Sequence, residues 1–106
     1  MSATTGFTSK TKITPSIDDG VIENATIAAA NVEQSHTFPA GTVQFLVKAR
    51  GSGKIKLAHT LGTSGSTYLT IHPGSVYTSP EFKPDAKTIY FQSPVAGLVI
   101  EMESWA

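Results

Sequence analysis

The sequence predicts an all-β fold: an antiparallel β-sandwich or jelly roll of about seven strands, preceded by an extended N-terminal arm. From Val32 onward, short segments of alternating apolar and polar residues are separated by Gly, Pro and Ser at intervals of about ten residues, as in sandwiches and barrels. The alternation favours antiparallel pairing, because buried parallel strands read as continuous apolar runs. The chain also contains 11 Ser and 14 Thr, whose hydroxyl groups suit exposed strand faces.

The composition is that of one globular domain, since 40% of the residues are hydrophobic and 15% are charged. The formal net charge is zero, so the chain lacks the broad positive field that dominates nucleic-acid affinity, and we expect no nucleic-acid partner. The absence of Cys excludes disulfides, a thiolate nucleophile and Cys-containing zinc sites. No signal peptide is evident, and no apolar run approaches the roughly 18 residues that span a bilayer, so we expect no membrane partner.

The chain is expected to divide into an N-terminal extended arm, residues 1–31, and a β-sandwich domain, residues 32–106. The first 17 or so residues are polar, contain Pro15 and show no amphipathic period that would hold them against a core. Residues 21–30 carry several apolar side chains and are expected to be extended. The arm is able in principle to pair with an exposed strand edge on a neighbouring chain.

The first strands of the sandwich are expected at residues 42–50 and 54–61, joined as a hairpin by the tight turn at residues 51–53. Both segments alternate with a period of two, which is typical of a strand buried on one face. The predicted inward residues are Val43, Phe45, Val47 and Ala49 in the first segment, and Ile55, Leu57, His59 and Leu61 in the second.

Further strands are expected at residues 67–72, around Val76, and at residues 87–92 and 98–104. The intervening segment 79–86 contains two prolines, which a central strand does not accommodate, so it is expected to be a loop. The predicted inward residues of these strands are Leu69, Ile71, Ile89, Phe91, Leu98, Ile100 and Met102.

No residue pattern indicates a catalytic, cofactor-binding or metal site, so we expect a protein that is not an enzyme and holds no cofactor. The segment GSGK at residues 51–54 lacks the other residues of a phosphate-binding loop and suits a turn. The histidines, His36, His59 and His72, lack the short spacing of a helical metal motif. Glu101 and Glu103 lie two apart on one strand face, where solvation or cross-strand pairing accounts for them.

Outward-facing strand residues are the candidates for an interface with another protein. Four basic side chains between residues 48 and 56 are predicted to project from one face of the hairpin as a basic patch. This patch would meet an acidic surface, either the two glutamates of the last strand or a neighbouring subunit. Two apolar residues on the same outward faces suggest coverage by another chain or by the arm. The interface candidates are Lys10, Lys12, Ile13, Leu46, Lys48, Arg50, Lys54, Lys56, Val99, Glu101, Glu103 and Trp105.

Four segments carry a resemblance to a known class of proteins: QFLVKAR at residues 44–50, YLTIHPG at 68–74, IYFQS at 89–93, and IEME at 100–103 followed by Trp105. Over about residues 32–105, the chain resembles the small β-sandwich structural proteins of tailed-bacteriophage virions. The resemblance implies a decoration or cement protein of the capsid, a collar or connector component, or a module of a fibre or tail. It implies no catalytic residues.

The function that the resemblance implies is a capsid decoration or cement protein that binds and stabilises the major capsid shell. Such a protein is located in the virion after assembly in the host cytoplasm, and its expected partners are the major capsid protein or another virion protein and further copies of itself. A head–tail collar or connector component is one alternative. Another is a carbohydrate-binding module of a fibre or tail, with Tyr68, Tyr77, Tyr90 and Trp105 as stacking platforms for a glycan. A metal-dependent enzyme on a jelly roll would require the three histidines to converge.

Overall fold

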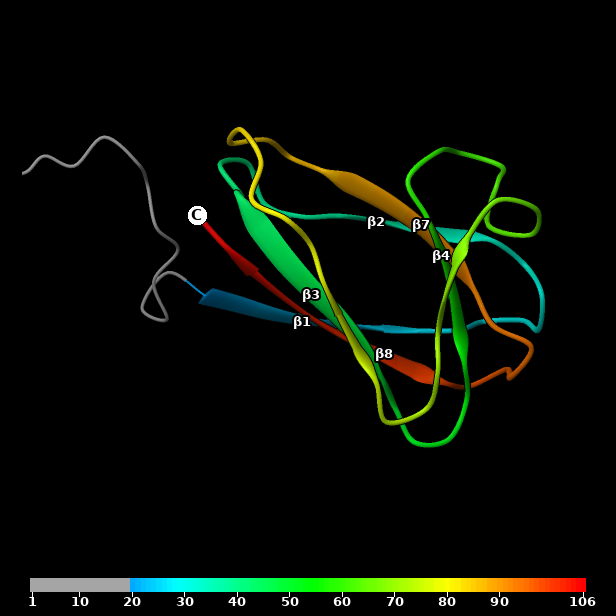
Figure 1. The fold of residues 1–106 in the computed structure, drawn as a ribbon. Helices are drawn as coiled ribbons and strands as arrows, with labels where there is room; N and C mark the ends of the chain where they lie inside the picture. The colour runs from blue at the N-terminus through cyan, green and yellow to red at the C-terminus, as the bar shows by residue number, and fades with distance from the viewer. Residues whose placement is uncertain (1–19) are drawn as a thin grey trace, which may run out of the picture.

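The computed structural model describes residues 20–106, which form two four-stranded antiparallel sheets stacked as a β-sandwich (Figure 1). The all-β fold class expected from the sequence is therefore confirmed, and the described part of the chain contains no helix. The strands are β1 (Gly20–Thr26), β2 (Gln34–Thr37), β3 (Gln44–Arg50), β4 (Ile55–Ala58), β5 (Leu69–Ile71), β6 (Val76–Thr78), β7 (Thr88–Gln92) and β8 (Val99–Trp105).

The strand order identifies the sandwich as a jelly roll. The sheets have the orders β1-β8-β3-β6 and β2-β7-β4-β5. The first strand pairs with the eighth, the second with the seventh, the third with the sixth and the fourth with the fifth, so the chain doubles back as one long antiparallel ribbon. Pairing of β3 with β8 and of β4 with β7 rolls this ribbon into the two sheets. Eight strands connected in this way are the jelly-roll arrangement.

The strand beyond the expected seven is β2, with the sequence QSHT. It contains no apolar residue, so the alternation that predicts a half-buried strand is missing. β2 is nevertheless held in place by antiparallel pairing with the apolar strand β7. Its half-buried His36 ring packs edge-on against Phe38, with the ring centroids 5.0 Å apart.

Buried side chains from both sheets form one core between the layers. All the predicted inward residues of β3, β7 and β8 are buried, which agrees with their period-two alternation. The rings of Phe38 and Phe45 stack within this core, with centroids 4.6 Å apart and an interplanar angle of 20°. The inward assignment fails for His59, Leu61 and Leu69, which are all exposed, the two leucines to 72% and 52%. β4 ends before Leu61, and Leu69 lies on the edge strand β5.

The predicted hairpin between residues 42–50 and 54–61 is wrong. β3 and β4 lie in different sheets, and residues 51–53 carry the chain across from one layer to the other. Gly53 is buried at this crossing, where an added Cβ would lie 2.9 Å from the side chain of Leu98. The glycine therefore permits a close approach of the backbone to the side chain of Leu98, which directly precedes β8, a role that is distinct from a hairpin turn.

The boundary expected between the arm and the sandwich at residue 32 does not match the structure. β1 pairs with β8 along its whole length, from Gly20 opposite Trp105 to Thr26 opposite Val99, so residues 20–31 are part of the sandwich. β1 was expected to be extended, and it is. The remainder of the expected arm, including the interface candidates Lys10, Lys12 and Ile13, lies outside the described residues.

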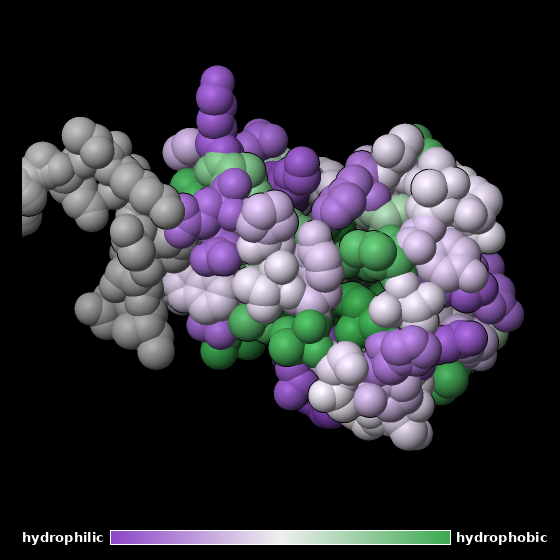
Figure 2. Space-filling model, viewed as in Figure 1, coloured by the Kyte–Doolittle hydropathy of each residue, from purple (hydrophilic) through white to green (hydrophobic). Residues whose placement is uncertain are grey.

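The two sides of the sandwich are closed to different degrees. On the side of β1 and β2, Glu23 Oε1 lies 2.9 Å from His36 Nε2, and Gln34 Nε2 donates a hydrogen bond of 3.1 Å to the Thr26 carbonyl. These contacts connect the two sheets. On the side of β5 and β6 the surface is hollowed, and Figure 2 shows hydrophobic side chains between the two halves of the molecule in this view.

Candidate functional site

The candidate site is the outward surface of the β1-β8-β3-β6 sheet, which we call the outer face. β8 and β3 are adjacent and antiparallel, with Gln44 opposite Trp105 and Arg50 opposite Val99. Outward side chains of these two central strands therefore alternate with buried ones and lie in register across the sheet. Seven of the interface candidates are brought together here: Leu46, Lys48, Arg50, Val99, Glu101, Glu103 and Trp105.

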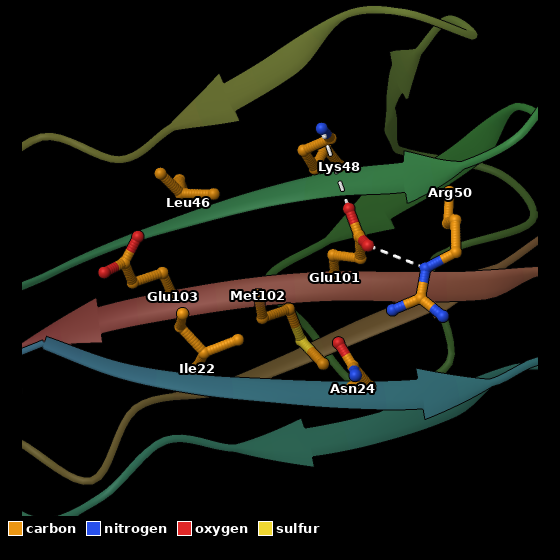
Figure 3. A pocket seen from close by; sticks show the side chains of 8 residues that line it. All are labelled: Ile22, Asn24, Leu46, Lys48, Arg50, Glu101, Met102 and Glu103. Atoms are coloured by element: carbon orange, nitrogen blue, oxygen red, sulfur yellow. Dashed lines mark hydrogen bonds and ion pairs between the residues drawn. The ribbon is translucent and has the colours of Figure 1, made fainter.

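A three-membered ion-pair network lies at the centre of the outer face (Figure 3). Arg50 Nε donates to Glu101 Oε2 at 2.7 Å, and Lys48 Nζ lies 3.6 Å from Glu101 Oε1. The hydrogen bond from Arg50 is the main cause of a lowered pKa of the Glu101 carboxyl, and the charge of Lys48 contributes to it. All three groups contact solvent, so the network fixes side-chain positions more than it stabilises the fold. The expectation that the basic residues meet a glutamate of the same sheet is confirmed for this pair of cations.

Apolar side chains flank this network. Ile22 on β1 is 73% exposed and Val76 on β6 is 54% exposed, while Leu46 lies between them on β3. A shallow hollow of about 270 Å³ runs over the sheet between Ile22 and Leu46, as Figure 3 shows. Exposed aliphatic groups rimmed by charges are typical of a surface that contacts another molecule.

Glu103 is the charged residue of the outer face that has no ion pair within residues 20–106. It projects between Leu46 and Ile22, because all three residues occupy the same register row across β3, β8 and β1 (Figure 3). A carboxylate between two aliphatic side chains can accept a cationic group from a partner, and Lys48 and Arg50 do not compete for it because they pair with Glu101.

The sequence reasoning missed Ile22, Asn24 and Val76 as members of this face. Ile22 and Asn24 were assigned to the arm, although the alternation in VIENAT could have indicated a strand with one outward face. Val76 lies on β6, which has only three residues and offers too short a pattern for its face to be predicted.

Two of the basic candidates lie elsewhere, so the predicted continuous basic patch is wrong. Lys56 is on β4 in the opposite sheet, where its Nζ lies 5.0 Å from the centroid of the Tyr68 ring. Lys54 is exposed in the crossing that precedes β4. The patch is split because β3 and β4 face opposite directions on the two sides of the sandwich.

A second hollow, of about 180 Å³, lies on the side of β6 and is lined by Phe45, His59, Tyr77, Ser79, Pro80, Phe82 and Lys87. The pKa of His59 is lowered, mainly because partial burial disfavours the charged ring and also because of the positive charge of Lys87. Tyr77 packs between His59 and Phe45, with ring centroids 6.4 Å and 6.1 Å away.

A carboxylate clamp, which the sequence did not indicate, holds the connection between β4 and β5. Glu33 accepts hydrogen bonds from Gly62 N at 2.7 Å, from Ser64 N at 3.0 Å and from Ser64 Oγ at 2.5 Å. The Oγ of Ser64, which is fully buried, also accepts from Gln92 Nε2 at 3.0 Å. These bonds favour the ionised carboxyl and lower the pKa of Glu33, with the Ser64 hydroxyl as the largest cause.

The candidate metal-binding and glycan-binding residues lie apart from one another in the fold. Within residues 20–106, no three His, Asp or Glu side chains form a group that could hold a metal ion, so the histidines do not converge. Tyr90 and Trp105 lie on the outward faces of opposite sheets, since their neighbours in β7 and β8 point inward. Tyr77 packs against the core and Tyr68 lies beneath Lys56, so the four aromatic candidates form no common platform.

Comparison with known proteins gives no relative from which a role could be transferred. No protein-family model matches the chain, and neither the curated proteins nor the solved structures contain a significant match. In the described part of the chain, no helix is long and apolar enough to cross a membrane.

Proposed function

We propose that this protein is a structural protein of a bacteriophage virion, a decoration or cement protein that binds and stabilises the major capsid shell. The contact surface in this proposal is the outer face of the β1-β8-β3-β6 sheet. The observation that carries the proposal is the combination, on one sheet face, of exposed aliphatic side chains with Glu103, which has no ion pair within residues 20–106. Support also comes from the architecture, because jelly rolls are common among viral capsid domains, although they also occur in lectins and cupins.

The chemistry of the outer face defines the surface that it would fit. A complementary site on the shell would offer apolar groups to Ile22, Leu46 and Val76 and a cation to Glu103. Each single contact of this size is weak. A shell presents the same site many times, so several copies that are linked to one another gain affinity through avidity.

The test is a binding measurement with capsid shells that lack their decoration protein. We expect saturable co-sedimentation of the protein with the shells and a higher temperature of shell disruption once they are saturated. Val76→Asp, which places a carboxylate at an exposed aliphatic position of the outer face on the edge strand β6, should weaken binding at least tenfold. Val95→Asp is the matched control, because Val95 is 44% exposed in the loop before β8, away from the outer face, and should leave binding unchanged.

Two results would count against the proposal. The absence of saturable binding to any shell would contradict a capsid role, and binding to isolated necks or tails instead would support the collar or connector alternative. Equal loss of binding in Val76→Asp and Val95→Asp would show that the outer face is not the contact surface.

A further inference from the structure

Among residues 20–106, β1 is an edge strand whose outer edge pairs with no other strand. It has seven residues, whereas the other edge strands, β2, β5 and β6, have four, three and three. Edge strands of soluble proteins are normally short or carry Lys, Pro or a bulge, which prevents pairing with another chain. The sequence of β1, GVIENAT, contains neither Lys nor Pro, and its Val21 and Ile22 are 41% and 73% exposed.

The backbone groups of Ile22 and Asn24 point away from the sheet. Ile27 N donates to Leu98 O at 2.8 Å, so the alternation of an antiparallel ladder directs the odd-numbered residues of β1 toward β8 and the even-numbered residues outward. The carbonyl of Thr26 fits this pattern, because it accepts from the Gln34 side chain. Ile22 and Asn24 have no comparable partner within residues 20–106.

A second copy of β1 can satisfy these groups in an antiparallel, two-fold arrangement. Centring the two-fold axis on Ile22 pairs Gly20 with Asn24 of the other copy and sets the two Ile22 side chains beside each other. Centring it on Glu23 would place two carboxylates opposite each other, which is unfavourable. Centring it on Glu23 or Asn24 would also need the Thr26 carbonyl, which the glutamine of β2 already occupies. Of these three registers, the one at Ile22 is therefore compatible with both hydrogen bonding and charge, and it uses the outward groups of Gly20, Ile22 and Asn24 together.

We propose that two copies of this chain pair through β1 in this register, which joins their four-stranded sheets into one continuous eight-stranded sheet. The outward groups of residues 20–24 form the backbone bonds, and the two Ile22 side chains form an apolar contact. The contact is smaller than the standard interface of about 1,600 Å², so we expect a dissociation constant in the micromolar range. The dimer does not depend on the proposed capsid role.

The test uses the full chain and two measurements at concentrations from about 1 μM to 1 mM, which span the expected dissociation constant. Sedimentation velocity should show a monomer that converts to a dimer as the concentration rises. Amide hydrogen exchange should show protection of Ile22 and Asn24 that grows with concentration. The amides of Glu23 and Ala25 should be protected throughout, because they bond to β8.

A pair of matched variants measures the contribution of the β1 edge to the dimer. Ile22→Lys places two ammonium groups side by side at the two-fold axis and should raise the dissociation constant at least tenfold. Val76→Lys introduces the same charge at a similarly exposed aliphatic residue on the opposite edge strand of the sheet, and should leave the dimer unchanged.

Three outcomes would overturn the proposal. The first is a monomer at every concentration with unprotected amides at Ile22 and Asn24. The second is a monomer in which these amides are protected at every concentration, which would indicate that residues 1–19 of the same chain cover the edge. The third is a dimer in which the two amides stay unprotected or in which Ile22→Lys dissociates no more than Val76→Lys, since such a dimer uses another surface.

Discussion

Truncation of Phe45 to Ala should cause one of the largest losses of stability in this fold. The Phe45 side chain is 1% exposed, stacks on Phe38 with ring centroids 4.6 Å apart, and has the rings of Tyr77 and Phe82 at 6.1 Å. Removal of the ring loses about 2–3 kcal/mol of apolar burial and about 1 kcal/mol of aromatic contact, and leaves a cavity. We therefore expect the free energy of unfolding to fall by about 3–5 kcal/mol, a large share of the 5–15 kcal/mol typical of a domain.

Urea denaturation followed by the fluorescence of Trp105, the chain's single tryptophan, measures this loss. Phe45→Leu is the matched control, because it keeps most of the apolar volume and removes only the stacking, so it should cost about 1 kcal/mol. A loss below about 1 kcal/mol for Phe45→Ala would refute the reasoning, because it falls far outside the range for a buried aromatic residue. Equal losses for Ala and Leu would show that stacking, and not burial, supplies the stability.

Two further predictions concern titrating groups. The pKa of Glu33 is lowered in the folded chain, so its clamp contributes stability above the ordinary pKa of 4.5 that is lost as the pH falls through the folded pKa. The amide resonance of Ser64 should titrate with a midpoint below 4.5, and Glu33→Gln should abolish this titration; a midpoint at or above 4.5 would contradict the clamp. The pKa of His59 is also lowered, so stability should decrease as the pH falls below 6.5, where the unfolded chain binds the proton first. In NMR titrations Lys87→Met should raise the His59 midpoint toward 6.5, and an unchanged midpoint would leave burial as the sole cause.

Alternation was a reliable guide wherever a strand was long and had one face in the core. β3 and β8 each have seven residues that alternate without interruption, and their inward faces were predicted correctly. β2 was missed because an edge strand without apolar residues carries no such pattern, and its position depends on its partner β7. Strand pairing, a tertiary property, supplied the information that the local sequence lacked.

The connection after β3 shows why the sequence could not predict which strands are neighbours. A glycine-rich segment between two alternating strands is compatible with a hairpin within one sheet and with a crossing between two sheets, because both place the apolar residues inward. The structure has the crossing, and position 53 suits a glycine because the side chain of Leu98 occupies the space that a Cβ would need. The position of Leu98 follows from the pairing of the last strand, which lies far away in the sequence.

Whether the segment after β3 forms a hairpin or a crossing also determines which residues share the candidate site. The residues of β3 and β8 on the outer face were identified because they depend only on alternation within each strand. Lys54 and Lys56 were grouped with them only through the assumed hairpin, and the structure places Lys56 on the other side of the molecule. Ile22 was overlooked because β1 is the first described strand, and its strand partner among residues 20–106 is β8, which is far away in the sequence.

The central position of β8 has a consequence for how the protein is made. β8 leaves the ribosome after the other seven described strands, yet it lies between β1 and β3, and among residues 20–106 β1 has no other strand partner in its sheet. A nascent chain that extends only to β7 therefore exposes an unpaired side of both β1 and β3, which are the longest of the described strands from β1 to β7. Folding of this sheet must wait for the synthesis of β8, and such non-local pairing is slow. During this interval crowded chains can pair with one another instead, so a chaperone that shields strand edges should increase the yield of native protein.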